Sequence, residues 1–173
     1  QKGAGYLAEH TEMVKGKRLS GSEIVHKVAI ETSTNPRLLL AILEYQSGWV
    51  YGHPTDAKND LYPIGFGAAA DTGLYKELLI AAKVLAQGFY GWRDGSLVEL
   101  SFYSGGSGRL PPNLNAGSSA LMRLFATLYR QEVWEDDIFG SRSFLDFYQI
   151  MFGDYWARAA GVEPYLTDEL EQP

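Results

Sequence analysis

The sequence predicts a single, mainly α-helical domain with a buried central helix and one short β-hairpin. The first observation is an apolar run between helix start and stop signals at residues 35–49. The second is that most other apolar residues recur at the three- and four-residue spacing of helices. The third is that one segment around Leu100 alternates apolar and polar residues, as a half-buried strand does. A chain of 173 residues with 46% hydrophobic residues is long enough for one domain with a core.

The central helix is predicted from signals at both of its ends. The side chain of Asn35 can accept a hydrogen bond from the first turn, and Pro36 stands where its missing N–H costs nothing. Gly48 suits the left-handed residue that ends a helix. The helix must be surrounded by protein, because it is apolar on every side and the chain has no membrane-length apolar run. Its apolar residues are Leu38, Leu39, Leu40, Ala41, Ile42 and Leu43.

The residues before the central helix divide into an N-terminal arm, residues 1–19, and a first helix. The arm has little periodicity, so we expect an arm or a short helix there. Ser20 and Glu23 form a capping box, in which each side chain satisfies an amide of the other residue, and this predicts a helix at residues 21–32. The buried stripe of this helix consists of Ile24, Val25, Val28 and Ala29.

A long loop is predicted at residues 50–71, where glycine, proline and aspartate interrupt every pattern. A loop of this length inside a compact domain is usually functional or disordered. Its aromatic residues, Tyr51, Tyr62 and Phe66, argue against disorder. The residues that could bind a metal ion there do not have a recognisable ligand spacing. They are His53, Asp56 and Asp60.

A further helix follows the loop. Asp71 or Thr72 can cap it, and it is predicted to run to about Gln87. Glycine and aromatic residues after Gln87 indicate its end. Its buried face consists of Leu74, Leu78, Ala81, Ala82 and Leu85.

The β-hairpin is predicted from alternation and a glycine-rich turn. Val98, Leu100 and Phe102 alternate with polar residues, which is the period of a strand with one buried face. Residues 104–108 turn this strand back into a short return strand, and Pro111 keeps that strand short.

Two more helices complete the predicted domain, residues 20–161. Asn115 opens the first of them, and Ser141 or Ser143 caps the second. Between them, residues 132–137 are predicted to form a short acidic linker around Trp134. The second helix buries Phe144, Phe147, Tyr148 and Met151, and Gly153 ends it.

The tail, residues 162–173, is acidic and has no periodic apolar face. Residues 155–160 are predicted to add one or two helical turns before it. We interpret the tail as a linker, which suits a further domain after this one.

Composition excludes several classes of partner. The net charge of −6 and pI near 5.0 argue against nucleic acid and against anionic membrane surfaces. The absence of cysteine excludes disulfides and thiolate metal sites. No membrane insertion and no cofactor are predicted. The many aromatic residues are typical both of a core rich in rings and of domains that stack on sugars.

Residues 38–49 resemble the first motif of the lytic transglycosylase and goose-type lysozyme superfamily, in which a helix ends in the catalytic glutamate followed by serine. Gln46 stands at the glutamate position, with Ser47 and Trp49 matching the rest. An amide has no ionisable proton, so Gln46 cannot protonate a glycosidic oxygen. Glu44 lies two residues earlier, about 200° around the helix axis, and points nearly the opposite way.

The family's second and third motifs are present only as fragments. Residues 63–67 share a glycine and one apolar residue with the second motif. Residues 115–117, Asn-Ala-Gly, resemble the third, with Leu114 where the family has a tyrosine that positions the substrate's N-acetyl group. A competing match, residues 102–105, keeps the tyrosine and loses the asparagine. Asn115 is therefore either a sugar contact or a helix cap.

The resemblance implies a lysozyme-like fold, an extracellular or cell-envelope location, and peptidoglycan or a related glycan as partner. Three functions follow. The first is a degenerate module that binds glycan strands, the second an active enzyme that uses Glu44 as catalytic acid/base, and the third a structural interaction domain at the cell surface. In the second, Glu44 acts on the glycosidic bond; in a structural role it accepts backbone amides of the long loop instead. The predicted substrate-binding residues are Gln46, Ser47, Tyr51, Tyr62, Phe66 and Asn115.

Overall fold

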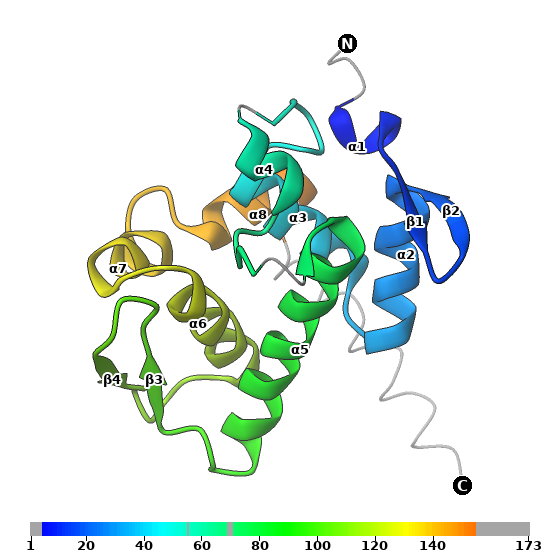
Figure 1. The fold of residues 1–173 in the computed structure, drawn as a ribbon. Coiled ribbons are helices and arrows are strands. Elements are labelled where there is room, and N and C mark those ends of the chain that lie inside the picture. Colours follow the sequence, from blue (N-terminus) through cyan, green and yellow to red (C-terminus); the bar gives the residue numbers. More distant parts are fainter. Residues whose placement is uncertain (1–4, 55, 69–70, 155–173) are drawn as a thin grey trace, which may run out of the picture.

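The computed structural model describes residues 5–54, 56–68 and 71–154, and its fold is mainly α, as predicted (Figure 1). Predictions for residues 155–173 lie outside the described residues. The helices are α1 (Tyr6–Glu9), α2 (Gly21–Thr32), α3 (Pro36–Ser47), α4 (Ala57–Leu61), α5 (Leu74–Arg93), α6 (Ala116–Leu128), α7 (Gln131–Phe139) and α8 (Phe144–Phe152). The strands are β1 (Thr11–Val14), β2 (Lys17–Ser20), β3 (Glu99–Ser101) and β4 (Ser107–Arg109).

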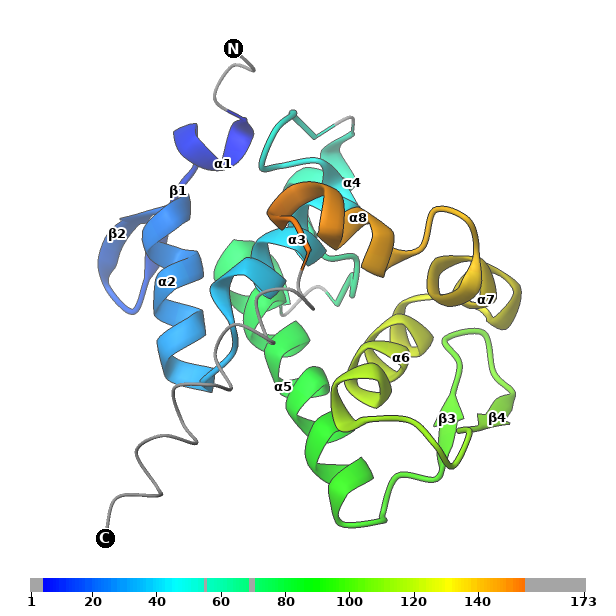
Figure 2. The same cartoon turned by 180° about the vertical axis from the view of Figure 1, so that it is seen from behind.

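Helix α3 occupies the middle of the molecule, between α2, α5 and α8, with which it makes contacts (Figures 1 and 2). The hairpins β1–β2 and β3–β4 lie at opposite sides of the helical core in both views. No described helix is long and apolar enough to cross a membrane.

The signals predicted for α3 act as expected. The side-chain oxygen of Asn35 accepts from the amide of Arg37 at 2.9 Å, and Gly48 ends the helix with φ of 69°. Leu39, Ala41, Ile42 and Leu43 are fully buried. The prediction of a buried central helix is therefore confirmed.

The N-terminal stretch contains a hairpin that the sequence did not predict. Strands β1 and β2 pair antiparallel, with Glu12 opposite Leu19, and lead directly into α2. The capping box of α2 is present, since the Ser20 amide donates to Glu23 at 2.7 Å and the Ser20 hydroxyl accepts from the Glu23 amide. Four-residue strands carry too little alternation to be recognised, and Val14 alone of β1 is buried.

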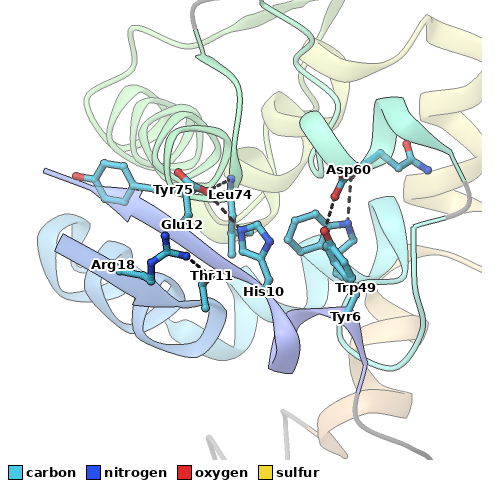
Figure 3. A network of polar contacts seen from close by, with 10 residues as sticks. Tyr6, His10, Thr11, Glu12, Arg18, Trp49, Asp60, Leu74 and Tyr75 are labelled. Carbon is cyan, nitrogen blue, oxygen red and sulfur yellow. Dashed lines mark hydrogen bonds and ion pairs between the residues drawn. The ribbon is translucent and has the colours of Figure 1, made fainter. Parts of the chain in front are cut away.

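Residues 5–12 tie this N-terminal stretch to the long loop between α3 and α5 (Figure 3). The Tyr6 hydroxyl donates to Asp60 at 2.6 Å, and the indole of Trp49 donates to the carbonyl of Asn59 at 3.1 Å. The amide of Tyr6 donates to the carbonyl of Gly52 at 2.7 Å. The chain passes so close here that a Cβ on Gly5 would lie 2.2 Å from the Val50 carbonyl oxygen. The loop predicted at residues 50–71 is thus held from outside, and it also contains helix α4.

Helix α5 differs from its prediction at both ends. Its N-cap is Gly73, and neither Asp71 nor Thr72 caps it. The carboxylate of Glu12 accepts instead from the amides of Leu74 at 2.7 Å and Tyr75 at 3.4 Å, so the cap comes from a distant strand (Figure 3).

The predicted end of α5 at Gln87 is wrong, because the helix continues to Arg93. Gly88 lies inside it, where a Cβ would stand 2.6 Å from the Cα of Ala120 in α6. This glycine allows two helices to approach closely; it does not end one.

The predicted acidic linker at residues 132–137 is wrong, because these residues belong to helix α7. The indole of Trp134 donates to the carbonyl of Met122 at 2.8 Å and its ring meets Phe102 edge-on. Helix α7 thereby covers a small second core beneath the β3–β4 hairpin. That core consists of Leu97, Leu100, Phe102, Leu110, Met122 and Ala126.

The β3–β4 hairpin and the last helix form where predicted. Leu100 is buried as expected, but Val98 is 56% exposed, because Leu97 takes the inner position at the start of the strand. The Ser143 hydroxyl accepts from the amide of Asp146 and caps α8. The prediction of a single hairpin is corrected, since β1–β2 is a second one.

Candidate functional site

Glu44 lies in the last turn of α3, where the long loop begins. Its Oε2 atom accepts from the amides of Val50 at 2.7 Å and Tyr51 at 3.0 Å. The carboxylate thus fixes the chain immediately after the helix ends at Gly48. The structural role that the sequence allowed for Glu44, acceptance of loop amides, is confirmed.

Gln46, which the motif match aligns with the catalytic glutamate of the lytic transglycosylase superfamily, points to the inside of the protein. Its Oε1 accepts from the Tyr129 hydroxyl at 2.8 Å, and its Nε2 is buried with no hydrogen-bond partner within the described residues. Ser47 is also buried, and its hydroxyl donates to the carbonyl of Leu43, one turn earlier in the helix. The hydroxyl of Ser47 is therefore used within α3.

A cleft of about 640 Å³ opens beside Glu44, between the end of α3 and the turn that joins α7 to α8. We call it the α3–α7 cleft. Its volume lies in the range of small-molecule sites. Its lining contains four carboxylates and one guanidinium, so the cleft carries a net negative charge. The charged residues are Glu44, Asp136, Asp137, Asp146 and Arg142, and the aromatic ones are Tyr45 and Phe147.

Asp137 is the most constrained carboxylate of the cleft. Its Oδ1 accepts from the Tyr45 hydroxyl at 2.6 Å, while its Oδ2 is buried without a partner within the described residues. Burial raises the pKa of Asp137 above its ordinary value, and the hydrogen bond from Tyr45 opposes this only in part. Asp137 thus has one oxygen bound by Tyr45 and one buried oxygen without a partner within the described residues.

Two tyrosines connect Asp137 to Gln46. Burial raises the pKa of Tyr129 to about 12, and the charge of Asp137 adds to this effect. Tyr45 is held among rings, with centroids 5.2 Å from Phe147 and 5.5 Å from Phe144. The cluster therefore joins α3 to α7 and α8.

The remaining predicted site residues lie apart from this cluster. Tyr51 is 44% exposed, and Tyr62 is partly exposed at the end of α4. Phe66 packs against the main core, and its amide donates to Glu77. None of these three lines the α3–α7 cleft.

Asn115 lies at the other end of α3 from Gln46. It caps α6, its Oδ1 accepting from the Ser118 amide at 2.8 Å, so the helix-cap interpretation holds. It lines a separate, mainly apolar groove of about 610 Å³, together with Asn35 and Leu38 from the first turn of α3. Asn35 and Gln46 are eleven residues apart, which corresponds to roughly 16 Å along a helix. The structure therefore does not bring Asn115 and Gln46 into one site.

Sequence reasoning missed Asp137 and Glu77, a fully buried carboxylate in α5. Asp137 lies in the segment for which the sequence predicts an acidic linker, residues 132–137. Glu77 had a signal, because it stands three residues after Leu74 and four before Ala81, on the buried stripe of its helix. A charged residue at such a position is a buried group that needs partners. Within the described residues, no group of three or more His, Asp or Glu side chains suits a metal ion.

Comparison with known proteins gives one match. The family model described as "LasA, N-terminal domain" matches residues 1–165. No curated protein matches the chain, and no solved structure does.

Proposed function

This chain belongs to the LasA N-terminal domain family, and we propose that it is a non-catalytic module that binds a glycan strand of the peptidoglycan type. The binding site is the α3–α7 cleft. The observation that carries the proposal is a polar cleft of suitable volume whose lining contains Asp136, Asp137 and Asp146.

The chemistry of the cleft suits sugar hydroxyls. Carboxylates accept hydrogen bonds from hydroxyl groups, and bonds to a charged acceptor are the stronger ones. Asp136, Asp137 and Asp146 supply such acceptors, and the ring of Phe147 supplies an apolar face on which a pyranose can lie. Arg142 can donate to a carboxylate of the ligand.

The absence of catalysis in this proposal rests on Gln46 and Glu44. Gln46 has no proton to give and its oxygen is bound by Tyr129. Glu44 holds two loop amides through one oxygen, so movement of its carboxylate releases the loop. A group with this anchoring role is a poor candidate for the proton transfers of glycoside cleavage.

The proposed location is outside the cell or in the cell envelope, where such glycans occur. The family's description names an N-terminal domain. This agrees with the interpretation of the acidic tail as a linker to a further domain.

The test is binding of the purified chain to insoluble peptidoglycan and to soluble N-acetylglucosamine oligomers. Asp137→Asn keeps the size and the bond from Tyr45 but removes the charge, and it should weaken binding about tenfold or more. Glu135→Gln is the matched control, since this exposed residue lies on the same helix outside the cleft. No binding by the wild type, or equal binding by both variants, contradicts the proposal. Complete absence of binding favours the third function, an interaction domain that does not use sugar.

An active enzyme is the second candidate, and one observation favours it. Glu44 and Asp137 line the same cleft, and burial raises the pKa of Asp137 while Glu44 is hydrogen-bonded to amides. Two carboxylates in different surroundings are the arrangement in which one acts as acid and the other as base. Release of soluble fragments from peptidoglycan by the wild type, lost in both Glu44→Gln and Asp137→Asn, would establish this candidate in place of the first.

A further inference from the structure

Glu77 is a carboxylate in the first turn of α5 that has no access to solvent. Its exposed fraction is 0%, and the other fully or mostly buried polar residues of the described part are serines. A buried carboxylate is costly unless it is hydrogen-bonded or neutral. Its surroundings therefore reveal what it does.

One oxygen of Glu77 is surrounded by backbone amides of a single turn. Oε2 accepts from the amides of Ile64 at 3.1 Å, Gly65 at 2.8 Å and Phe66 at 3.2 Å. Gly65 has φ of 103°, a conformation that lets successive amides point toward one acceptor. The turn is thus shaped around the carboxylate.

The other oxygen of Glu77 is not satisfied. Oε1 is buried and has no hydrogen-bond partner within the described residues. Burial raises the pKa of Glu77 above its ordinary value of 4.5, and the amides of the turn oppose this effect without cancelling it. The geometry agrees with this direction, because Oε1 of the ionised group is buried and receives no hydrogen bond within the described residues.

Other titratable groups reach this end of α5 from β1 and α2. Glu12 accepts from the amides of Leu74 and Tyr75, and His10 lies 3.6 Å from Glu12. Glu31 of α2 accepts from the Tyr75 hydroxyl at 2.7 Å. None of these side chains is among the influences on Glu77, which are its burial and the amides of the turn.

We propose that Glu77 is an ionisation-dependent latch for the turn at residues 63–67, closed when the carboxyl is protonated and weakened when it is charged. Opening of the turn brings water to Glu77 and exposes Ile64, which is fully buried, and Phe66, which packs on the core. The latch does not depend on the proposed glycan binding.

The direction of the effect follows from linkage. In the closed turn Glu77 has a raised pKa, and in the opened, hydrated turn its pKa returns toward 4.5. Between these two values the closed form holds the proton and the open form does not. Opening therefore becomes more favourable as pH rises through this window, by up to about tenfold per pH unit. Below 4.5 both forms are protonated, and the closed turn keeps its full stability.

The experiment is hydrogen exchange of the whole chain by NMR, at a series of pH values from about 4 to 8. Protection factors of the Ile64, Gly65 and Phe66 amides are corrected for the intrinsic pH dependence of exchange. We expect them to fall with rising pH by up to about tenfold per unit within the window. Glu77→Gln, which cannot ionise, should make them independent of pH.

Glu12→Gln is the matched control, because Glu12 also accepts from consecutive amides but its side chain is 22% exposed. It should leave the pH dependence at residues 64–66 unchanged. A flat profile in the wild type, or the same dependence in Glu77→Gln, overturns the proposal. If Glu77→Gln does not fold, the carboxyl ¹³C titration of Glu77 in the wild type decides. Its midpoint must coincide with the pH at which the loss of protection ends, because that pH is the pKa of the closed form, and a midpoint elsewhere overturns the latch.

Discussion

Glu44 and Glu77 anchor the two ends of the same long loop, and they differ mainly in burial. Glu44 accepts two amides just after α3, on the edge of a cleft. Glu77 accepts three amides of the turn at residues 63–67, with no exposure to solvent. The number of donors is similar, yet of these two carboxylates only Glu77 has a buried oxygen without a hydrogen-bond partner within the described residues. Hydrogen bonds from amides position both carboxylates, whereas burial determines how the charge of each carboxylate affects the stability of the fold.

The difference also separates two kinds of role. Glu44 lines a cleft, so a ligand can reach its surroundings while it holds the loop. Glu77 is enclosed, so it acts on the loop alone. The loop is further held from outside by Tyr6 through Asp60. The chain thus fixes its longest irregular segment at several points, which accounts for its order despite its length.

The largest expected effect is the removal of the buried anchor. Glu77→Ala leaves three amides without an acceptor and opens a cavity, so it should lower the free energy of unfolding by about 3 kcal/mol or more. Urea unfolding followed by circular dichroism measures this. A loss of less than about 1 kcal/mol would show that the turn does not depend on Glu77.

The pH dependence of stability should differ between Glu77 and Glu31, because their pKa values are shifted in opposite directions. Glu77 has a raised pKa, so its favourable contribution is complete below pH 4.5 and is lost as pH rises through the folded pKa. Glu31 acts in the opposite direction, because the hydrogen bond from Tyr75 and pairing with lysines lower its pKa to about 2. Its contribution is present above pH 4.5 and is lost as pH falls toward 2.

Unfolding at a series of pH values should therefore separate the two residues. Glu77→Gln removes part of the decline above pH 4.5, which for one proton is at most about 1.4 kcal/mol per pH unit, and leaves the acid decline unchanged. Tyr75→Phe should reduce only the decline below pH 4.5. If Glu77→Gln alters the acid limb, the assignment of the two limbs is wrong.

A smaller loss is expected at the partly exposed anchor. Glu44→Gln keeps an oxygen that can accept the Val50 and Tyr51 amides but loses the charge, so stability should fall by about 1 kcal/mol. Glycan binding should stay nearly unchanged, because Asp137 carries it in our proposal. Paired measurements of melting temperature and binding check this. Unchanged stability with lost binding would place Glu44 in the site.

The sequence predicts the ends of a helix when the contacts that fix those ends come from residues nearby in the chain. The ends of α3 are set by Asn35, Pro36 and Gly48, which act within one turn, and they were predicted. The cap of α5 comes from Glu12, 62 residues away, and nothing near Gly73 indicates it. Helix α7 was missed because its acidic residues are typical of a solvated linker, whereas its place depends on contacts of Trp134 with α6 and the hairpin.

The candidate site shows the same limit. Motif matching selected Gln46 and Asn115, but Asn115 lines the groove beside the first turn of α3, whereas Gln46, in the last turn, lines neither that groove nor the α3–α7 cleft. Asp137 enters the site only through the fold of α7 and its bond from Tyr45. Sequence identified the helix end that carries the site and not the residues that face it.

The smallest expected effect concerns catalysis. The purified chain should not clear suspensions of bacterial cell walls between about pH 4 and 8, because Gln46 supplies no acid. Gln46→Glu should restore little activity, since Leu114 stands where the lytic transglycosylase superfamily that the motif resembles has a tyrosine, and catalytic groups act as a unit. Turbidity assays measure both. Lysis by the wild type that disappears in Glu44→Gln would restore the enzyme, and a high rate from Gln46→Glu alone would show that the rest of the site is intact.

Binding of glycan in the α3–α7 cleft can be tested by NMR titration with a soluble N-acetylglucosamine oligomer. The largest chemical-shift changes are expected at Asp137, Arg142 and Phe147, which line this cleft. Changes centred on Asn115 and Leu38 in the apolar groove, or no changes at millimolar oligomer, would contradict it.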